Sequence, residues 1–324
     1  QIVVKAFRRV QRQIVRAHFL SINNQFVHML RNVPNILDLS KHGIDAATWK
    51  RDIEATVGRL KEGRLSLADA TAYIYLYDQM TGKRGDRDIR YLCIDEVQDY
   101  SAFQLAFLKY SFPRAKFTLL GDLNQAIFTH ENSRKLLGEL SSMFPADKTR
   151  VIQLTKTYRS TAQITNFTKH LLTNGEEIEP FDRQGELPAI HVEPGVDAAV
   201  EQVNKQAEAN LAEHETTAII GKTLKECKTL SEKLGEIGVK STLIRTENQR
   251  LVKGIIVVPS YLAKGLEFDS VIMWDASKAC YPDDRDRQLV YTICTRAMHR
   301  LTIIATKELS PIFKAVPASE YQMA

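Results

Sequence analysis

The sequence is poor in cysteine, and its few cysteines have none of the spacings that metal or redox sites require. The four cysteines form no CxxC pair, and none of the eight histidines lies at metal-ligand spacing from another. The sequence also lacks a cleavable signal pattern and any apolar run near the length of a bilayer span. We therefore expect a soluble intracellular protein of a reducing compartment, without a zinc site and without a membrane partner.

Acidic residues are missing from residues 1–19, which carry five basic side chains. This local charge equals the net charge of +5 of the whole 324-residue chain. Such a segment is interpreted as a solvated helix face, and mild basicity permits an anionic partner without requiring one. Charge alone therefore does not separate a DNA partner from an acidic protein surface. With 44% apolar and 26% charged residues, the composition is that of an ordinary globular protein.

The spacing of apolar residues changes near residue 85. Before it, the spacing is helical throughout, with a strong helix over residues 67–80 that Ser66 caps and Gly82 ends. After it, strands and helices alternate, which predicts an α/β fold with parallel sheets. We predict strands over 89–97, 116–122, 151–154, 189–192, 217–220, 254–258, 270–274 and 301–305, and helices over 102–110, 134–143 and 161–172.

Two sequence features refine this organisation. Ser101 and Gln104 form a capping box for the helix over 102–110. The loop near residues 174–185 is the best domain boundary. The prediction is a helical region over 1–85, the second half of one sheet domain over 86–175, and a second sheet domain over 176–324.

Two carboxylates, Asp95 and Glu96, directly follow the apolar run 91–94. Phosphoryl transfer from a nucleotide needs magnesium, a group that orients water, and positive charge for the transition state. Asp95 would hold the magnesium ion, and Glu96 would accept a proton from the attacking water. The alternative is a surface turn with three acids, which the position at a strand end makes less attractive.

Four further segments carry side chains suited to the same chemistry. Each segment alone is more often structural, but five in this order make coincidence improbable. They offer Gln125 for the γ-phosphate or the water, Tyr158 as a face for adenine, Arg159 for phosphate, Glu267 for a ribose hydroxyl, and Arg296, on a predicted helix, as an arginine finger.

In this order, the segments resemble motifs II to VI of the UvrD/Rep group of superfamily 1 helicases, whose motors are P-loop (RecA-like) domains. They look most like the HelD branch, which comprises bacterial ATPases associated with RNA polymerase. The resemblance covers about residues 65–310, and residues 1–60 match it by position only. It is carried by LADATAYIYLY (67–77), DEVQDYSAFQ (95–104), LLGDLNQAIF (119–128), LTKTYRS (154–160) and YTICTRAMH (291–299).

The resemblance implies ATP and Mg²⁺ as cofactors, RNA polymerase as partner with DNA secondary, and a bacterial cytoplasmic location. It also implies roles for single residues. These are Asp95 as magnesium ligand, Glu96 as base, Gln125 as γ-phosphate sensor, Arg159 and Arg296 as transition-state arginines, Tyr158 as adenine stack, Glu267 with Lys264 and Gly265 as nucleotide contacts, and Gln98 and Asp99 as coupling residues.

A phosphate-binding loop of the form G-x4-G-K-[ST] is absent from the sequence. Gly221-Lys222-Thr223 has Thr216 in place of the first glycine, and Thr216 precedes the predicted strand instead of following it. We therefore predict an ordinary strand-to-helix turn there. Gly82-Lys83-Arg84 fails at its last residue. The family's loop lies upstream of motif II, so we expect a C-terminal part of a longer protein, which alone binds ATP poorly and hydrolyses none measurably.

The residues that contact single-stranded DNA in UvrD-like translocases are also altered. The continuation of motif III is Phe128–Asn132, and motif V opens with Pro259, Ser260 and Tyr261, of which only Tyr261 could stack on a base. This favours a HelD-like ATPase that releases or recycles RNA polymerase. A UvrD/Rep-type DNA translocase in repair and a non-catalytic, motor-derived binding module remain the alternatives.

Overall fold

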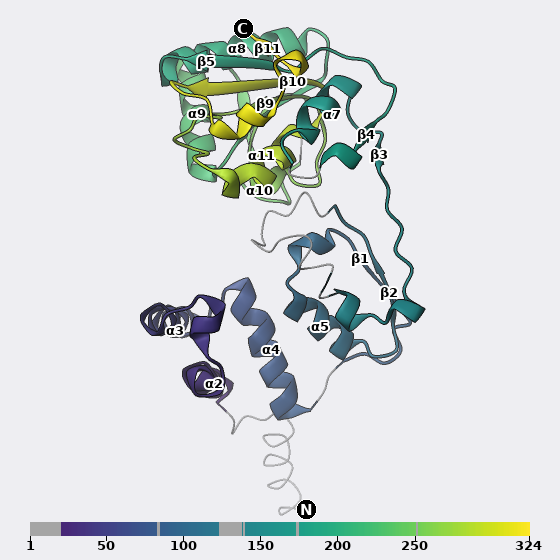
Figure 1. Ribbon diagram of the computed structural model, residues 1–324. Helices are drawn as coiled ribbons and strands as arrows, with labels where there is room; N and C mark the ends of the chain where they lie inside the picture. The colour runs from purple at the N-terminus through teal and green to yellow at the C-terminus, as the bar shows by residue number, and fades with distance from the viewer. Residues whose placement is uncertain (1–20, 83–84, 123–137, 139, 173–174, 251) are drawn as a thin grey trace, which may run out of the picture. The chain divides into compact units, whose positions relative to one another are not determined.

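The computed structural model describes residues 21–82, 85–122, 138, 140–172, 175–250 and 252–324 (Figure 1). The basic segment 1–19, Gln125 and half of the helix predicted over 134–143 lie outside these residues. The chain divides into two compact units. The first unit comprises residues 1–95 and 100–120, and the second comprises residues 96–99 and 121–324.

The first unit begins with helices, as predicted for its described part. They are α2 (Ile22–Ile36), the 3-10 helix η1 (Leu39–His42), α3 (Ala46–Lys61) and α4 (Leu67–Thr81). Ser66 caps α4 by accepting a hydrogen bond from the amide of Asp69, and Gly82 with φ +94° ends it. The ring of Tyr73 on α4 forms a T-shaped pair with the fully buried ring of Phe26 on α2, with ring centroids 5.3 Å apart.

A two-stranded parallel sheet completes the first unit. It consists of β1 (Tyr91–Ile94) and β2 (Lys116–Leu119), joined by α5 (Ala102–Ser111), whose predicted capping box is present. Both strands are shorter than predicted. Ladder pairing ends at the hydrogen bond from Leu120 N to Ile94 O, and the backbone of Glu96 then turns into the left-handed region at φ +52°.

The second unit contains a seven-stranded sheet in the order β11-β5-β10-β9-β6-β8-β7, in which every pairing is parallel (Figure 1). This confirms the predicted α/β class with a parallel sheet. Its strands are β5 (Ala189–Glu193), β6 (Thr216–Gly221), β7 (Ser241–Leu243), β8 (Gly254–Pro259), β9 (Phe268–Met273), β10 (Ala297–Thr306) and β11 (Gln322–Met323).

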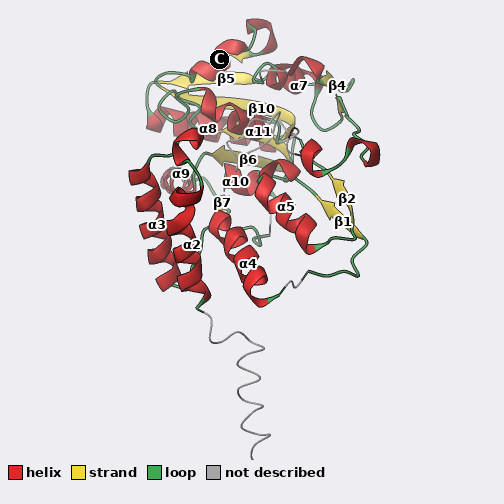
Figure 2. Ribbon diagram, turned by 60° about the horizontal axis from the view of Figure 1, so that its bottom comes forward, coloured by secondary structure: helices red, strands yellow, loops and turns green. Residues whose placement is uncertain are grey.

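Helices cover both faces of this sheet (Figure 2). On one face, α8 (Val196–Leu211) and α9 (Leu224–Glu236) pack on residues such as Ile219 and Ile272. On the other face, α7 (Ala162–Lys169), α10 (Ser260–Ala263) and α11 (Arg287–Cys294) pack on Ile220 and Ile303. Burial on both faces explains the nearly continuous apolar strands of the sequence.

Three features differ from the sequence prediction. Residues 151–154 form no strand: Val151 and Leu154 are 82% and 88% exposed, and the nearby strand is instead β3 (Lys156–Thr157), paired with β4 (Glu179–Pro180). The short edge strands β7 and β11 were not predicted, because they have too few residues to show the alternation of a strand. Finally, α7, assigned by sequence to the domain before residue 175, packs within the second unit. No helix in the described ranges has the length and apolarity of a membrane span.

We expect Phe167→Ala to lower the free energy of unfolding of the second unit by about 3 to 5 kcal/mol, because it removes a fully buried ring. Phe167 lies on α7 with its ring centroid 6.2 Å from those of Phe313 and Tyr321. Denaturant unfolding in a Trp49→Phe background measures this through Trp274. The control Ile237→Ala removes a half-exposed side chain of the same unit and should cost under about 1 kcal/mol. A similar small loss for Phe167→Ala would contradict the packing of α7 on this unit.

We expect the second unit to lose stability as pH falls below about 6.5, the ordinary histidine value. His191 on β5 is buried against Gln202, and burial lowers its pKa; burial, then Arg183, also lowers the pKa of His299. Both histidines therefore bind a proton less readily in the folded unit than in the unfolded chain. Their contribution to the free energy of unfolding is complete above the histidine pKa of the unfolded chain and is lost as the pH falls below it. His191→Gln should flatten the decline between pH 7.5 and 5.5, whereas His42→Gln, in the first unit, should not. An unchanged slope in His191→Gln would contradict the assignment.

Candidate functional site

The two predicted catalytic carboxylates follow β1 directly. Asp95 is exposed, and Glu96 is half-buried. Because β1 and β2 are parallel, their carboxyl ends meet at one edge of the small sheet, where Leu120 N bonds to Ile94 O at 2.8 Å. An exposed carboxylate at such an edge is a suitable oxygen ligand for magnesium.

The turn after Glu96 is tightly held. Asp99 N donates to Glu96 O at 2.9 Å, and the amide of Gln98 donates to Glu96 Oε2 at 2.5 Å. Gln98 is only 1% exposed, so its amide has little freedom to leave the carboxylate. A Cβ on Gly121 would lie 2.3 Å from Gln98 Oε1, which explains why a glycine is needed at this position. Gln98 and Asp99, predicted as coupling residues, thus brace the turn of Glu96.

Three other predicted residues gather at the amino ends of β9 and β10. Arg159 Nε donates to Glu267 Oε1 at 2.5 Å, and the Arg296 guanidinium is close enough to both for their charges to affect its pKa. Backbone bonds fix this arrangement: Phe268 N donates to Arg296 O at 3.0 Å, and Thr161 N donates to Met298 O at 3.2 Å. The sheet therefore joins two arginines and a glutamate that lie far apart in the sequence.

Arg296 is the largest side chain that is almost completely buried among the described residues, at 1% exposure. Its Nε donates to Thr292 O at 3.1 Å, and its Nη1 donates to Leu266 O at 3.4 Å. Burial, reinforced by the neighbouring Arg159, lowers its pKa to about 10, so the group is still charged at neutral pH. The sequence prediction set Arg296 on a helix; instead it lies in the turn between α11, which ends at Cys294, and β10.

Tyr158 presents an aromatic face, as adenine stacking would require. The side chain is 64% exposed, and its ring centroid lies 4.9 Å from that of Phe181. Lys156 Nζ lies within 6.0 Å of both ring centroids, which adds positive charge beside the aromatic pair. Phe181 was not singled out from the sequence, because its position becomes meaningful only through the pairing of β3 with β4.

Lys264 and Gly265 form the turn between α10 and β9. Gly265 has φ +76°, a conformation that explains the glycine. The Lys264 ammonium lies 2.5 Å from Asp99 Oδ2 and 3.4 Å from Glu96 Oε2. The predicted nucleotide contact of Lys264 therefore stays a prediction, whereas its contacts with two carboxylates of the motif II segment are structural.

Tyr291 on α11 has no role predicted from the sequence. This buried phenol lies near Asp122, and burial followed by the charge of Asp122 raises its pKa, while Arg296 and Arg159 act in the opposite direction. The charges of Asp122 and of both arginines therefore act on Tyr291. Its presence in the YTICTRA segment was the one signal that could have identified it.

Gly221-Lys222-Thr223 is a strand-to-helix turn, as predicted. Gly221 ends β6, and Thr223 caps α9 in a capping box with Glu226. Lys222 Nζ pairs with Asp286 at 2.9 Å and lies 4.9 Å from the ring centroid of Tyr281. The lysine is therefore engaged within the second unit, and the turn is not a phosphate-binding loop.

The residues present fit a magnesium ion that arrives with a nucleotide. Magnesium in such sites is held by one or two carboxylates together with substrate phosphates and water, which the single exposed carboxylate of Asp95 can satisfy. Across the described ranges, no group of three or more histidine, cysteine, aspartate or glutamate side chains is arranged to hold a metal ion.

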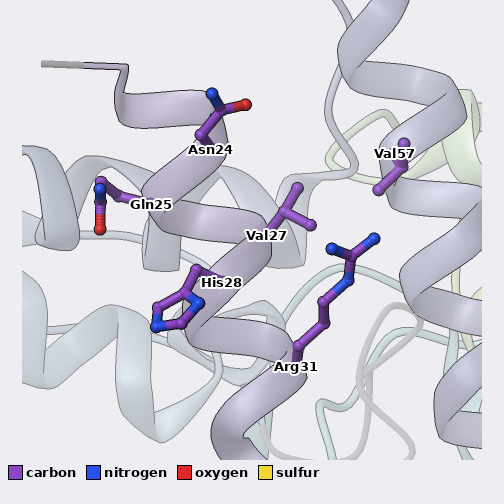
Figure 3. A pocket seen from close by; sticks show the side chains of 6 residues that line it. All are labelled: Asn24, Gln25, Val27, His28, Arg31 and Val57. Carbon is purple, nitrogen blue, oxygen red and sulfur yellow. The ribbon is translucent and has the colours of Figure 1, made fainter.

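A groove of about 530 Å³ lies in the first unit. Figure 3 shows Val27 and Arg31 extending from α2 toward Val57 on α3, with Asn24, Gln25 and His28 along α2. None of the predicted site residues lines this groove.

Comparison with known proteins finds similarity to helicases. Residues 254–304 match the UvrD-like helicase C-terminal domain. ATP-dependent DNA helicase Rep of Escherichia coli is 33% identical over 144 residues, which cover 44% of this chain and 20% of Rep. This chain is related to the UvrD/Rep-type superfamily 1 helicases. Rep of Salmonella typhimurium is 32% identical over 144 residues, so the chain spans about a fifth of the length of these curated relatives.

A solved structure with higher identity is the C-terminal domain of a possible DNA helicase from Lactobacillus plantarum. It is 51% identical, and the alignment covers 52% of this chain and 98% of that chain, with a TM-score of 0.47. The matches to the UvrD-like helicase C-terminal domain and to Rep support the predicted relationship at the level of the UvrD/Rep group.

We expect Gly121→Ala to destabilise the second unit by about 1 to 3 kcal/mol, because the new methyl group would overlap the buried side chains of Gln98 and Val97. Denaturant unfolding followed by Trp274 fluorescence measures the loss. The control Gly235→Ala, on α9, adds a methyl group in open space and should be neutral or stabilising. Equal effects of the two substitutions would show that Gly121 is not needed for close packing.

Proposed function

We propose that this chain forms the motif II to VI part of an ATP-hydrolysing motor whose phosphate-binding loop lies outside residues 1–324. The sequence contains no such loop, yet it retains side chains for every other requirement of phosphoryl transfer. No simple binding role needs a strand-end carboxylate pair together with two clustered arginines. Residues 1–324 alone should therefore bind ATP weakly and hydrolyse none measurably.

The observation that carries this proposal is the location of Arg159, Glu267 and Arg296 at the amino ends of β9 and β10. In an open parallel sheet, the ligands of that sheet bind beyond the carboxyl ends of the strands. A charged cluster at the amino ends suits a different task, which is to complete a site whose phosphates are held by another part of the protein. Arginines in that position stabilise negative charge that develops during phosphoryl transfer.

The roles of the residues follow from their chemistry. Glu96 is the proton acceptor for the attacking water, and Arg159 and Arg296 stabilise the charge of the transferred phosphoryl group. Tyr158 offers its exposed face to adenine, and Glu267 accepts a hydrogen bond from a ribose hydroxyl. Asp95 would hold Mg²⁺, which neutralises the β- and γ-phosphate oxygens when bound.

Within the UvrD/Rep group, we assign the chain to the HelD-like branch, which couples hydrolysis to release or recycling of RNA polymerase. The support is the likeness of DEVQDYSAFQ, LLGDLNQAIF and YTICTRAMH to that branch. The altered strand-contacting positions also support it, since Ser260 is buried and donates its hydroxyl to Lys222 O. RNA polymerase is then the main partner, and nucleic acid is secondary.

A UvrD/Rep-type DNA translocase is the second candidate, and it is favoured by the 33% identity to Rep over 144 residues. Tyr261, the one aromatic residue left at the opening of motif V, is 39% exposed and accessible to a stacked base. The motor residues serve both functions equally and do not discriminate between them.

We expect Glu96→Gln to lower ATP turnover of the full-length protein by about 100- to 10,000-fold, because the substitution removes the proton acceptor. Turnover is measured alone, with single-stranded DNA and with RNA polymerase. If the function is HelD-like, single-stranded DNA does not change the rate of ATP turnover. The protein then binds RNA polymerase and releases nucleic acid from the polymerase.

Strong stimulation by single-stranded DNA would instead establish the translocase. Full activity of Glu96→Gln would contradict the assignment of the base, and absence of turnover in the wild-type full-length protein would contradict the ATPase itself. Glu308→Gln, at an exposed ion pair with Lys278, is the matched control and should leave turnover unchanged.

A further inference from the structure

Lys264 is a lysine whose charge is removed from solvent. Its side chain is 7% exposed, and its ammonium lies 2.5 Å from Asp99 Oδ2 and 3.4 Å from Glu96 Oε2. A buried ammonium requires anionic partners, and here both partners come from the turn that carries the proposed catalytic base. By contrast, the exposed pairs of the same unit, such as Lys278 with Glu308, lie on the surface, where ion pairs contribute little.

The Glu96 carboxylate is held from two sides. Its Oε2 accepts a hydrogen bond from the amide of the buried Gln98 and also faces the Lys264 ammonium. The Glu96 backbone adopts φ +52°, which L-residues rarely occupy, so surrounding contacts must maintain it. Strained backbone held by a second set of residues is typical of a functional site.

The turn that carries Lys264 also organises the arginine cluster. Three residues after Lys264, Glu267 pairs with Arg159, and between them the carbonyl of Leu266 accepts a hydrogen bond from Arg296. Residues 264–267 therefore contact the base turn and both arginines at once. Movement of this turn would change the positions of all three groups together.

We infer that Lys264 is a positioning residue, whose ammonium, shared with Asp99, holds the Glu96 carboxylate in the orientation needed to accept a proton. This inference rests on the proposed ATPase function and deepens it. It gives Lys264 a role different from the nucleotide contact that the resemblance implies. The two roles predict different kinetics, because a nucleotide contact affects KM, whereas a residue that orients the base affects kcat.

We expect Lys264→Met in the full-length protein to lower kcat for ATP by about 10- to 100-fold, with KM changed less than about threefold. Lys264→Arg keeps the positive charge and should restore most of the turnover. Lys278→Met removes a lysine from an exposed ion pair and should leave kcat unchanged. Thermal melting of each variant verifies that it is folded, and the arginine variant tests the role if the methionine variant does not fold.

Asp99→Asn and the double variant Asp99→Asn/Lys264→Met test whether the pair acts as a unit. If it does, the double variant loses no more kcat than the more damaging single variant. A rise in KM alone would overturn the positioning role in favour of a nucleotide contact, and a variant with both kcat and KM within twofold of wild type would overturn both roles. Absence of turnover in the wild type would instead overturn the proposed function and this role with it, so the two failures are distinguishable.

Discussion

The pairing of β9 with β10 is the constraint on which the candidate site depends. Ala297 is in register with Phe268, and the amide of Phe268 bonds to the carbonyl of Arg296. This register brings the turn before β9 and the turn before β10 to one edge of the sheet, with Glu267 and Arg296 as immediate neighbours of the paired residues. Ser160 then donates to Ala297 O at 2.6 Å and brings Arg159 to the same edge. Backbone geometry therefore assembles the charges.

Burying these charged side chains together costs free energy. The cost is reduced because acidic groups accompany the basic ones and because backbone carbonyls accept hydrogen bonds from Arg296. Arg296 lies in a site where burial and a second arginine oppose its charge, yet Glu96 and Glu267 favour it, and its nitrogens donate to carbonyls of Thr292 and Leu266. A buried guanidinium is tolerated under these conditions because the carbonyl acceptors lie where the N–H groups of the planar guanidinium point. The same balance explains why the arginine remains charged at neutral pH despite its lowered pKa.

Local features were predictable from the sequence, and contacts between distant segments were not. The capping box of Ser101 and Gln104 and the turn at Gly221–Thr223 follow from neighbouring residues, so they were predicted correctly. The long strands of the second sheet were also predicted, because burial on both faces gives them nearly continuous apolar sequences. The pair of Lys264 and Asp99, separated by 165 positions, depends on tertiary structure and leaves no local pattern. The apolar segment 151–154 was mistaken for a strand because its composition, without a pairing partner, does not distinguish strand from exposed chain.

Two lysines in glycine-containing turns illustrate why we propose the arginines, and not these lysines, as the contacts of an anionic ligand. Lys222 is paired with Asp286, and Lys264 with Asp99, so each ammonium already has a carboxylate partner within the second unit. An ammonium is a compact charge, and such a pairing neutralises most of its effect on a third group. Arg159 is different, because its contact with Glu267 uses Nε, one of five donors on a planar fork. An arginine can therefore bind a carboxylate and a phosphate at the same time, which makes Arg159 the better choice for a group that is anchored in the fold and also acts on a nucleotide.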